Sequence, residues 1–159
     1  MQDTDRYLLF TVDEQVLAVK IGVVERIIRA VETTDLPDAP ENITGVINFR
    51  GGIIPVLSLR RQFSLPEINT RSGEDFIIVK TSNRTLVLTA DAVSQVVAIP
   101  SENIIPASRV LSKLEYVQGF GKSEDGIIII LNLEKLINLQ DEEQLSKTLN
   151  KISGDEKVK

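Results

Sequence analysis

The stretch that decides the fold is Gly45-Val-Ile-Asn-Phe-Arg-Gly-Gly-Ile-Ile-Pro-Val-Leu-Ser-Leu-Arg-Arg-Gln-Phe63. It aligns without a gap to a second stretch 74 positions later, Gly119-Phe-Gly-Lys-Ser-Glu-Asp-Gly-Ile-Ile-Ile-Ile-Leu-Asn-Leu-Glu-Lys-Leu-Ile137. Six of the 19 aligned positions are identical, beginning with the glycine that opens each copy. Each copy reads as two apolar strands joined across a polar or Gly-rich turn, which is typical of a β-hairpin.

A second segment upstream of each hairpin also repeats, at an offset of 69 positions. Tyr7-Leu-Leu-Phe10 aligns with Phe76-Ile-Ile-Val79, and the apolar positions continue to track each other beyond that point. The five-residue difference between the two offsets falls in one loop between Pro106 and Gly119. Two long copies predict a duplicated β module rather than a solenoid, which needs about three or more units to bury its core.

The composition supports a strand-rich protein, because 19 Ile and 16 Val stand against seven aromatic residues. β-Branched side chains are stiff and fit pleated, half-buried surfaces. We therefore expect a mostly β fold with two pseudo-repeated five-stranded barrels, and the sequence leaves open whether they exchange strands. The expected units are a single domain over 1–159 with sub-barrels 6–63 and 75–137. The expected strands are 7–12, 16–20, 26–31, 44–49 and 52–59, then 76–80, 84–89, 95–99, 117–121 and 126–131.

The C-terminal part of the chain predicts a helix over 141–152. Asp141 can cap its N-terminus, and acidic residues follow in the first turn. Leu145, Leu149 and Ile152 fall on one stripe of that helix. We expect the stripe to pack on the body of the protein rather than on a partner.

The composition also excludes several classes of function. The chain has no Cys and no His, which removes the thiolate nucleophile, the commonest general base and the commonest metal ligand. A net charge of −5 argues against a nucleic-acid binder. No apolar run approaches the ~20 residues of a membrane-spanning helix. We expect a cytoplasmic protein without catalytic activity, cofactor or metal.

One pair of charges is present in the first copy only. Glu25 lies among apolar residues and aligns with the uncharged Ser94, while Arg50 aligns with Glu124, which has the opposite charge. A charge that the other copy does not keep is not required by the fold of the module, so it can serve contact with a partner. We expect Glu25 and Arg50 to lie near each other; the alternative, two solvated surface charges, stays open.

These segments together resemble the chemotaxis coupling proteins of the CheW family, over about residues 6–140. The resemblance is carried by Gly45-Val-Ile-Asn-Phe-Arg-Gly51 with Ile54-Pro-Val-Leu-Ser-Leu-Arg60, by Val23-Val-Glu-Arg-Ile27 and by Ala90-Asp91-Ala-Val93. Ser58 stands where the family usually has Asp, Phe49 replaces the usual Leu, and Val87 stands where Gly is frequent.

The resemblance implies two SH3-like barrels around a shared core, and a scaffold that bridges chemoreceptor tips to a histidine autokinase. The receptor helix would lie in an apolar groove between the barrels, which is the helix-in-groove mode of recognition. The positions that match the family's receptor contacts are Val23, Glu25, Ile27, Gly45, Arg50, Val93 and Val96. The positions that match its kinase contacts are Ile105 and Val110.

Two rival interpretations stay open at the level of the sequence. The chain could be a coupling domain cut from a larger chemotaxis protein, although Met1 and the lack of kinase or receiver sequence after residue 140 favour a complete protein. It could also be an enzyme that uses paired carboxylates in the groove between the barrels. The absence of His and Cys makes that second rival the weaker one.

Overall fold

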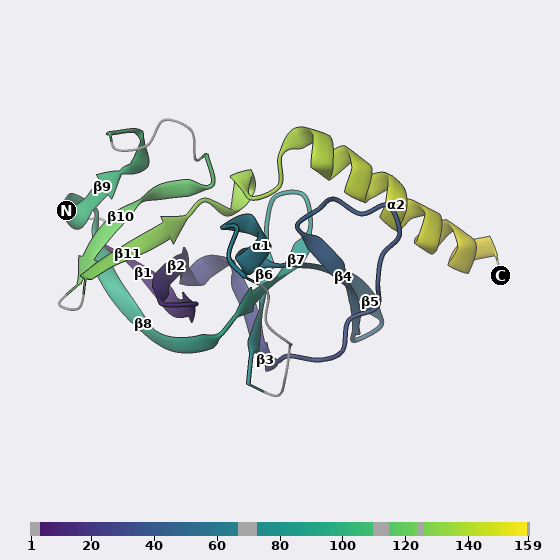
Figure 1. Ribbon diagram of the computed structural model, residues 1–159, viewed down its shortest axis with the longest axis horizontal. Helices are drawn as coiled ribbons and strands as arrows, with labels where there is room; N and C mark the ends of the chain where they lie inside the picture. The colour runs from purple at the N-terminus through teal and green to yellow at the C-terminus, as the bar shows by residue number, and fades with distance from the viewer. Residues whose placement is uncertain (1–3, 67–72, 110–114, 124–125, 159) are drawn as a thin grey trace.

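The computed structural model describes residues 4–66, 73–109, 115–123 and 126–158, and Figure 1 shows its overall arrangement. Two curved β-sheets lie side by side, with strand β8 (Ala92–Pro100) running from one toward the other, and a long C-terminal helix crosses one of them. The mostly β fold of two similar units that the repeat predicted is confirmed.

The helices and strands follow the duplicated pattern in chain order. The first copy contains β1 (Thr4–Val12), β2 (Gln15–Lys20), β3 (Val24–Arg29), β4 (Ile43–Phe49), β5 (Gly52–Leu57) and α1 (Leu59–Gln62). The second copy contains β6 (Asp75–Lys80), β7 (Thr85–Ala90), β8, β9 (Ile104–Pro106), β10 (Val117–Ser123), β11 (Gly126–Leu131) and then α2 (Leu139–Val158). Short 3-10 helices lie at Ile21–Val23, Ser101–Asn103, Ala107–Arg109 and Leu133–Lys135.

The two sheets exchange strands between the copies, which is the possibility that the sequence left open. Sheet A has the order β8-β1-β2-β11-β10-β9, and sheet B has the order β3-β6-β7-β5-β4. Sheet A therefore combines β1 and β2 of the first copy with β8, β9, β10 and β11 of the second. Sheet B combines β6 and β7 of the second copy with β3, β4 and β5 of the first. Because the copies carry similar apolar patterns, either pairing buries the same kinds of side chain, and the pattern alone cannot select between them.

The apolar core has three parts that follow this exchange. One cluster within sheet A contains Tyr7 and Ile130, and one within sheet B contains Phe76 and Val87. The largest cluster lies between the sheets and contains Phe10, with residues from both copies and from both helices. The shared core ties the two units into one body.

Pro55 lies on β5, which is an inner strand of sheet B, although proline cannot donate a backbone hydrogen bond to a neighbouring strand. The parallel pairing of β5 with β7 covers only Val56 and Leu57, so Pro55 lies just before it begins. On its other side Pro55 pairs with Val46 of β4. The missing N–H is thus accommodated at a place where β5 is locally an edge.

The C-terminal helix is longer than predicted and is capped by a different residue. It spans Leu139–Val158 rather than 141–152. The side-chain oxygen of Asn138 accepts a hydrogen bond from the Asp141 N–H at 2.7 Å, so Asn138 rather than Asp141 caps the helix. Leu145 is completely buried, and Leu149 and Ile152 pack against the central cluster. The prediction that this stripe packs on the protein itself is confirmed.

Three strand predictions need correction. Strand β3 begins earlier than the predicted 26–31 because the 3-10 helix Ile21–Val23 ends at Val23. Strand β8 is longer than the predicted 95–99, because β1 pairs along it from Thr4 to Thr11. The short strand β9 was not predicted at all, since a Pro ends it and its three residues pair only with β10.

Candidate partner-binding site

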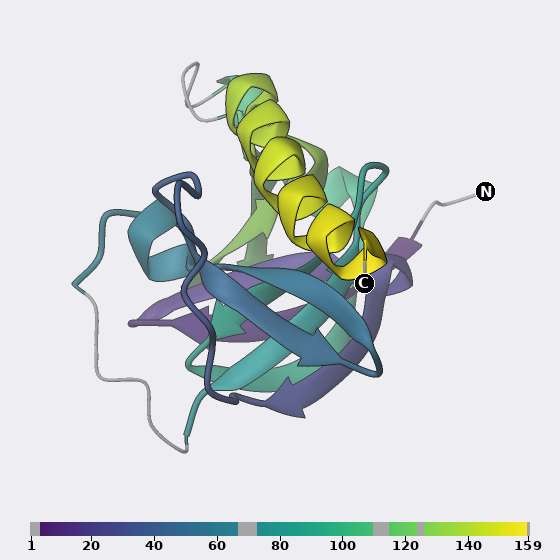
Figure 2. The same ribbon diagram turned by 90° about the vertical axis from the view of Figure 1, so that its right-hand side faces the viewer.

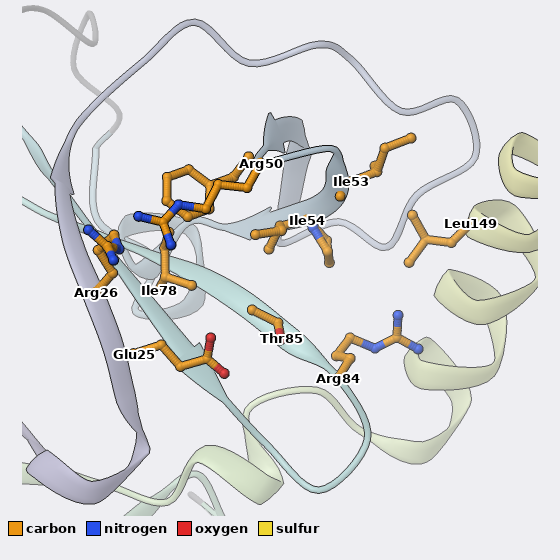
Figure 3. Close-up of a pocket in the computed structure, with 12 residues that line it drawn as sticks. Glu25, Arg26, Arg50, Ile53, Ile54, Ile78, Arg84, Thr85 and Leu149 are labelled. Carbon is orange, nitrogen blue, oxygen red and sulfur yellow. The ribbon is translucent and has the colours of Figure 1, made fainter.

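The concave feature of greatest interest is a pocket of about 520 Å³ at one end of sheet B. It lies between strand β3, the β4–β5 hairpin, the β6–β7 hairpin and helix α2, as Figure 3 shows. Its charged lining residues are Glu25, Arg26, Arg50 and Arg84. Its apolar lining residues include Phe49, Ile53, Ile54, Ile78 and Leu149.

The turn between β4 and β5 places Arg50 at the edge of this pocket. Arg50 and Gly51 both have positive φ, at 54° and 84°, which is the arrangement of a two-residue type I′ turn. The Asn48 side-chain oxygen accepts a hydrogen bond from the Gly51 N–H at 3.2 Å and holds the turn. An arginine in the left-handed region is strained by roughly 1–2 kcal/mol, so the backbone alone does not favour Arg at this position.

Two arginines share one aromatic ring at the edge of the pocket. The guanidinium of Arg50 lies 5.1 Å from the centroid of the Phe49 ring, and that of Arg26 lies 5.9 Å from the same centroid. Both distances are within the range of cation–π attraction, which is about 0.5–1 kcal/mol at exposed sites. The Phe49 ring is therefore the shared partner of both guanidiniums.

Glu25 lines the same pocket because the backbone bulges there. The pairing of β3 with β6 passes from Val24–Val79 to Arg26–Ile78, which leaves Glu25 as the extra residue. Glu25 and Arg50 both line this pocket, and their expected proximity stays a prediction. Among the described residues, however, no ion pair joins them, because Arg50 lies against the Phe49 ring instead.

Arg84 has a different role from the other two arginines of the pocket. It forms an ion pair with Glu142 of α2, and its Nη2 donates to the Ser146 hydroxyl at 2.7 Å. The side chains of Arg84 and Glu142 are each only 15% exposed. This clamp fixes helix α2 against the β6–β7 hairpin, which brings Leu149 to the wall of the pocket.

The predicted receptor contacts of the apolar type divide into two groups. Val23 and Val93 are half-buried and pack against the central cluster. Ile27 and Val96 are 42% and 45% exposed, and they lie on the edge strands β3 and β8 at aligned positions of the two copies. The second group is therefore available to a partner.

Gly45 has a structural reason for being glycine. It is buried, and a Cβ atom built on it would lie 2.3 Å from the backbone oxygen of Thr34. Gly119, its aligned counterpart, would bring a Cβ to 2.7 Å from the backbone oxygen of Ile105. Both glycines allow a neighbouring segment to pair closely with β4 or β10.

The predicted kinase contacts are only partly within the described residues. Ile105 lies on β9, one of the two edge strands of sheet A, and is 37% exposed. Val110 lies outside the described residues.

Several lining residues were missed by the sequence reasoning, although one signal was present. Arg26 and Arg84 align with Gln95 and Gln15, so the comparison that singled out Glu25 and Arg50 applies to them equally. Leu149 has no counterpart in the repeat, and only the packing of α2 reveals its place at the pocket.

The comparisons with known proteins agree on one family. A CheW-like domain model matches residues 6–141. The chain belongs to the CheW family. It is similar to chemotaxis protein CheW of Thermotoga maritima, with 30% identity over 131 residues, which cover 82% of this chain and 85% of the relative. It is also similar to chemotaxis protein CheW of Treponema pallidum, with 25% identity over 143 residues, 86% of this chain and 84% of the relative.

A solved structure supports the same assignment. The scaffolding protein TtCheW from Thermoanaerobacter tengcongensis superposes with a TM-score of 0.79 at 30% sequence identity. The match covers 87% of this chain and 96% of that chain. The match of the family model to this CheW-like chain ends at residue 141, so most of α2 lies beyond the matched part.

Proposed function

We propose that this chain is an adaptor that couples the cytoplasmic tips of chemoreceptors to a histidine autokinase in chemotaxis. Its membership of the CheW family supports this role, as does its similarity to TtCheW, a scaffolding protein. An adaptor needs binding surfaces rather than reactive groups, and the sequence contains no His and no Cys. The proposed activity is therefore binding, with no chemical step, cofactor or metal.

The observation that carries the proposal is the pair of exposed aliphatic side chains at aligned positions on two edge strands. Ile27 on β3 is 42% exposed, and Val96 on β8 is 45% exposed. Contiguous exposed apolar surface is typical of a protein–protein contact, and we propose that Ile27 and Val96 both contribute to one such surface. We propose that they receive the apolar stripe of a receptor helix. The full proposed receptor surface is Val23, Glu25, Ile27, Gly45, Arg50, Val93 and Val96.

Within that surface the residues have different proposed parts. Ile27 and Val96 contact the partner directly, while the half-buried Val23 and Val93 support them from the central cluster. Gly45 acts by allowing the backbone of Thr34 to pair with β4. Charged Glu25 and Arg50 contribute to orientation and selectivity more than to raw affinity.

The proposed kinase surface lies on β9, at the opposite edge of sheet A from β8. Ile105 is exposed on β9, and this strand has an unpaired edge in sheet A. An edge strand with an exposed aliphatic side chain can pair with another β domain. Val110, which follows in the chain, completes the proposed kinase contact.

We place the adaptor in the cytoplasm, at the inner face of the membrane, where receptor tips would recruit it. In the part of the chain that the structure describes, no helix is long and apolar enough to cross a membrane. Membrane association would therefore depend on the receptors.

Calorimetry with a purified receptor cytoplasmic fragment tests the receptor surface. Val96→Asp places a charge where the apolar stripe would dock, and we expect a loss of about 2 kcal/mol, or about 30-fold in Kd. Val31→Asp is the matched control, because Val31 is 47% exposed and lies outside the proposed surface. Reconstituted kinase activity with receptor, adaptor and autokinase should fall in parallel for Val96→Asp only. Equal binding by both variants would contradict the surface, and no binding by the wild-type chain would contradict the function.

A further inference from the structure

The pocket of sheet B is lined by three arginines and one glutamate, so its charged side chains are mostly positive. The net charge of the whole chain, in contrast, is −5. Arg84 is paired with Glu142. Arg26 and Arg50 have no carboxylate partner among the described residues, and both lie against the Phe49 ring. Glu25 could balance only one of them if it moved, so at least one guanidinium is left for a partner.

The remainder of the pocket is apolar. Ile53 of β5 and Leu149 of α2 approach the pocket from neighbouring elements, and Figure 3 shows the Leu149 side chain pointing from the helix toward Ile53. Ile78 of β6 lies deeper, where it belongs to the sheet B cluster. The volume of about 520 Å³ is ample for one large side chain together with part of the backbone that carries it.

The other copy of the module does without this arrangement. By the alignment of the repeats, Arg26, Phe49 and Arg84 correspond to Gln95, Ser123 and Gln15. The fold of the module therefore does not require a basic, aromatic pocket. The wall of the pocket that α2 forms is likewise not part of the module, because Leu149 lies beyond residue 141, where the match to the family model ends.

We propose that this pocket binds a segment of a protein partner in which a large apolar side chain lies beside a carboxylate. The apolar side chain would contact Ile53 and Leu149, and the carboxylate would pair with Arg26 and Arg50. A guanidinium held by an aromatic ring is preorganised, and charge-assisted contacts between guanidinium and carboxylate are among the stronger hydrogen bonds. A basic segment is disfavoured because it would meet two unpaired guanidiniums.

This inference deepens the proposed adaptor function and rests on it, because Glu25 and Arg50 belong both to the pocket and to the proposed receptor surface. It adds Arg26, Phe49 and Leu149 as selectivity residues, and it assigns to α2 a direct part in partner recognition. The clamp between Arg84 and Glu142 becomes a positioning device that holds Leu149 at the pocket.

The test uses the full-length, isotope-labelled chain and three helix-forming probe peptides of equal length. One peptide places Leu beside Glu, one places Leu beside Gln, and one places Leu beside Lys. We expect the Glu peptide to shift the backbone amide signals of Arg26, Arg50 and Leu149 in NMR spectra. We also expect it to bind about tenfold more tightly than the Gln peptide at low salt, with the preference shrinking as salt is added.

Matched variants locate the interaction. Arg26→Glu should abolish the preference for the Glu peptide, whereas Arg6→Glu, the same change at an exposed residue of β1, should keep it. Leu149→Glu should weaken the Glu peptide, whereas Asn150→Glu, at the neighbouring exposed residue, should not. Melting curves confirm that each variant is folded.

Calorimetry of the same variants with a receptor cytoplasmic fragment separates this inference from the adaptor function. Weaker binding of the fragment by Arg26→Glu and Leu149→Glu, but not by their controls, supports both. Equal binding by all variants, with no preference among the peptides, overturns the pocket inference and leaves the adaptor function in place. A preference for the Glu peptide without any binding of the fragment supports the pocket and contradicts the receptor as its partner.

Discussion

The β4–β5 hairpin and the β10–β11 hairpin are the two copies of one sequence repeat, but they have different surroundings. Helix α2 lies across the first, as Figures 1 and 2 both show, and Ile53 there packs against the central cluster. Ile127, the aligned residue of the second hairpin, is 65% exposed. The features that the copies share, such as Gly45 and Gly119, allow the close backbone pairing of the fold, and we propose that the features that differ mark surfaces for partners.

The same contrast applies to charge. The sheet B end of the molecule has Arg26 and Arg50 beside Phe49, whereas the aligned positions of the second copy have Gln95, Glu124 and Ser123. Since both copies build similar sheets, the fold cannot be the reason for the arginines. Changes at shared positions should therefore reduce stability, and changes at unshared positions should alter binding.

The largest loss of stability is expected for Gly45→Ala. The new Cβ would lie 2.3 Å from the Thr34 backbone oxygen, and neither backbone can move without breaking sheet pairing. Overpacking typically costs about 1–3 kcal/mol, and we expect more than about 4 kcal/mol here because the obstacle is backbone rather than a side chain. Chemical denaturation measures the effect, and Gly22→Ala is the control, because no atom lies within 4 Å of its added Cβ. Similar stability of the two variants would contradict the shared role of the glycines.

Leu145→Ala should also destabilise the protein, by about 2–4 kcal/mol, since Leu145 is completely buried between α2 and the core. Leu139→Ala, at a residue of the same helix that is 78% exposed, should have little effect. Unfolding followed by circular dichroism measures both. If Leu145→Ala were as stable as Leu139→Ala, α2 would not be anchored through this residue.

Arg50→Asn is expected to stabilise the protein slightly while weakening partner binding. Asn tolerates the φ of 54° better than Arg, so the strain of the turn should decrease by about 0.5–1 kcal/mol. The guanidinium that lies on Phe49 is lost in the same change. We expect a higher melting temperature, because the turn is less strained, together with weaker binding of the receptor fragment, because the guanidinium is lost. A lower melting temperature would mean that the Phe49 contact outweighs the strain.

The smallest expected effect is a pH dependence that one copy has and the other lacks. Burial and the nearby Asp5 carboxylate raise the pKa of Tyr7 above its ordinary value of 10.0, while the aligned residue is Phe76. As the pH rises, the Tyr7 hydroxyl loses its proton in the unfolded chain before it does so in the folded protein. The contribution of Tyr7 to the free energy of unfolding is therefore complete below about pH 10 and decreases as the pH rises through the folded-state pKa. Denaturation at about pH 9 and about pH 11 should show a smaller loss for Tyr7→Phe. An equal loss would place the effect elsewhere, for example at Tyr116, whose pKa burial also raises.

Much of the fold could be predicted from the sequence because the repeat fixes which segments are equivalent. The hairpins, the two units and the packing of Leu145 followed directly from apolar periodicity. Strand exchange could not be predicted, because β3 and β8 present similar apolar patterns to β1 and β6. The short strand β9 was also missed, since a segment that pairs over three residues leaves no periodic signal.

The site was only half predictable, for a related reason. Unshared charges identified Glu25 and Arg50, and both line the pocket. Among the described residues no ion pair joins Glu25 and Arg50, and the Arg50 guanidinium lies on the Phe49 ring. The sequence gives no sign of that ring contact. Leu149 could not be assigned from sequence, because its position depends on where α2 crosses sheet B.

The measurement that tests the central claim most directly is receptor-fragment binding by Arg50→Glu, compared with Lys122→Glu. Both residues are exposed, the first at the hairpin of sheet B and the second at the equivalent hairpin of sheet A. We expect Arg50→Glu to weaken binding about tenfold or more with a nearly unchanged melting temperature, and Lys122→Glu to bind like the wild-type chain. Equal binding by the two variants would contradict the claim that the differences between the copies mark the receptor site.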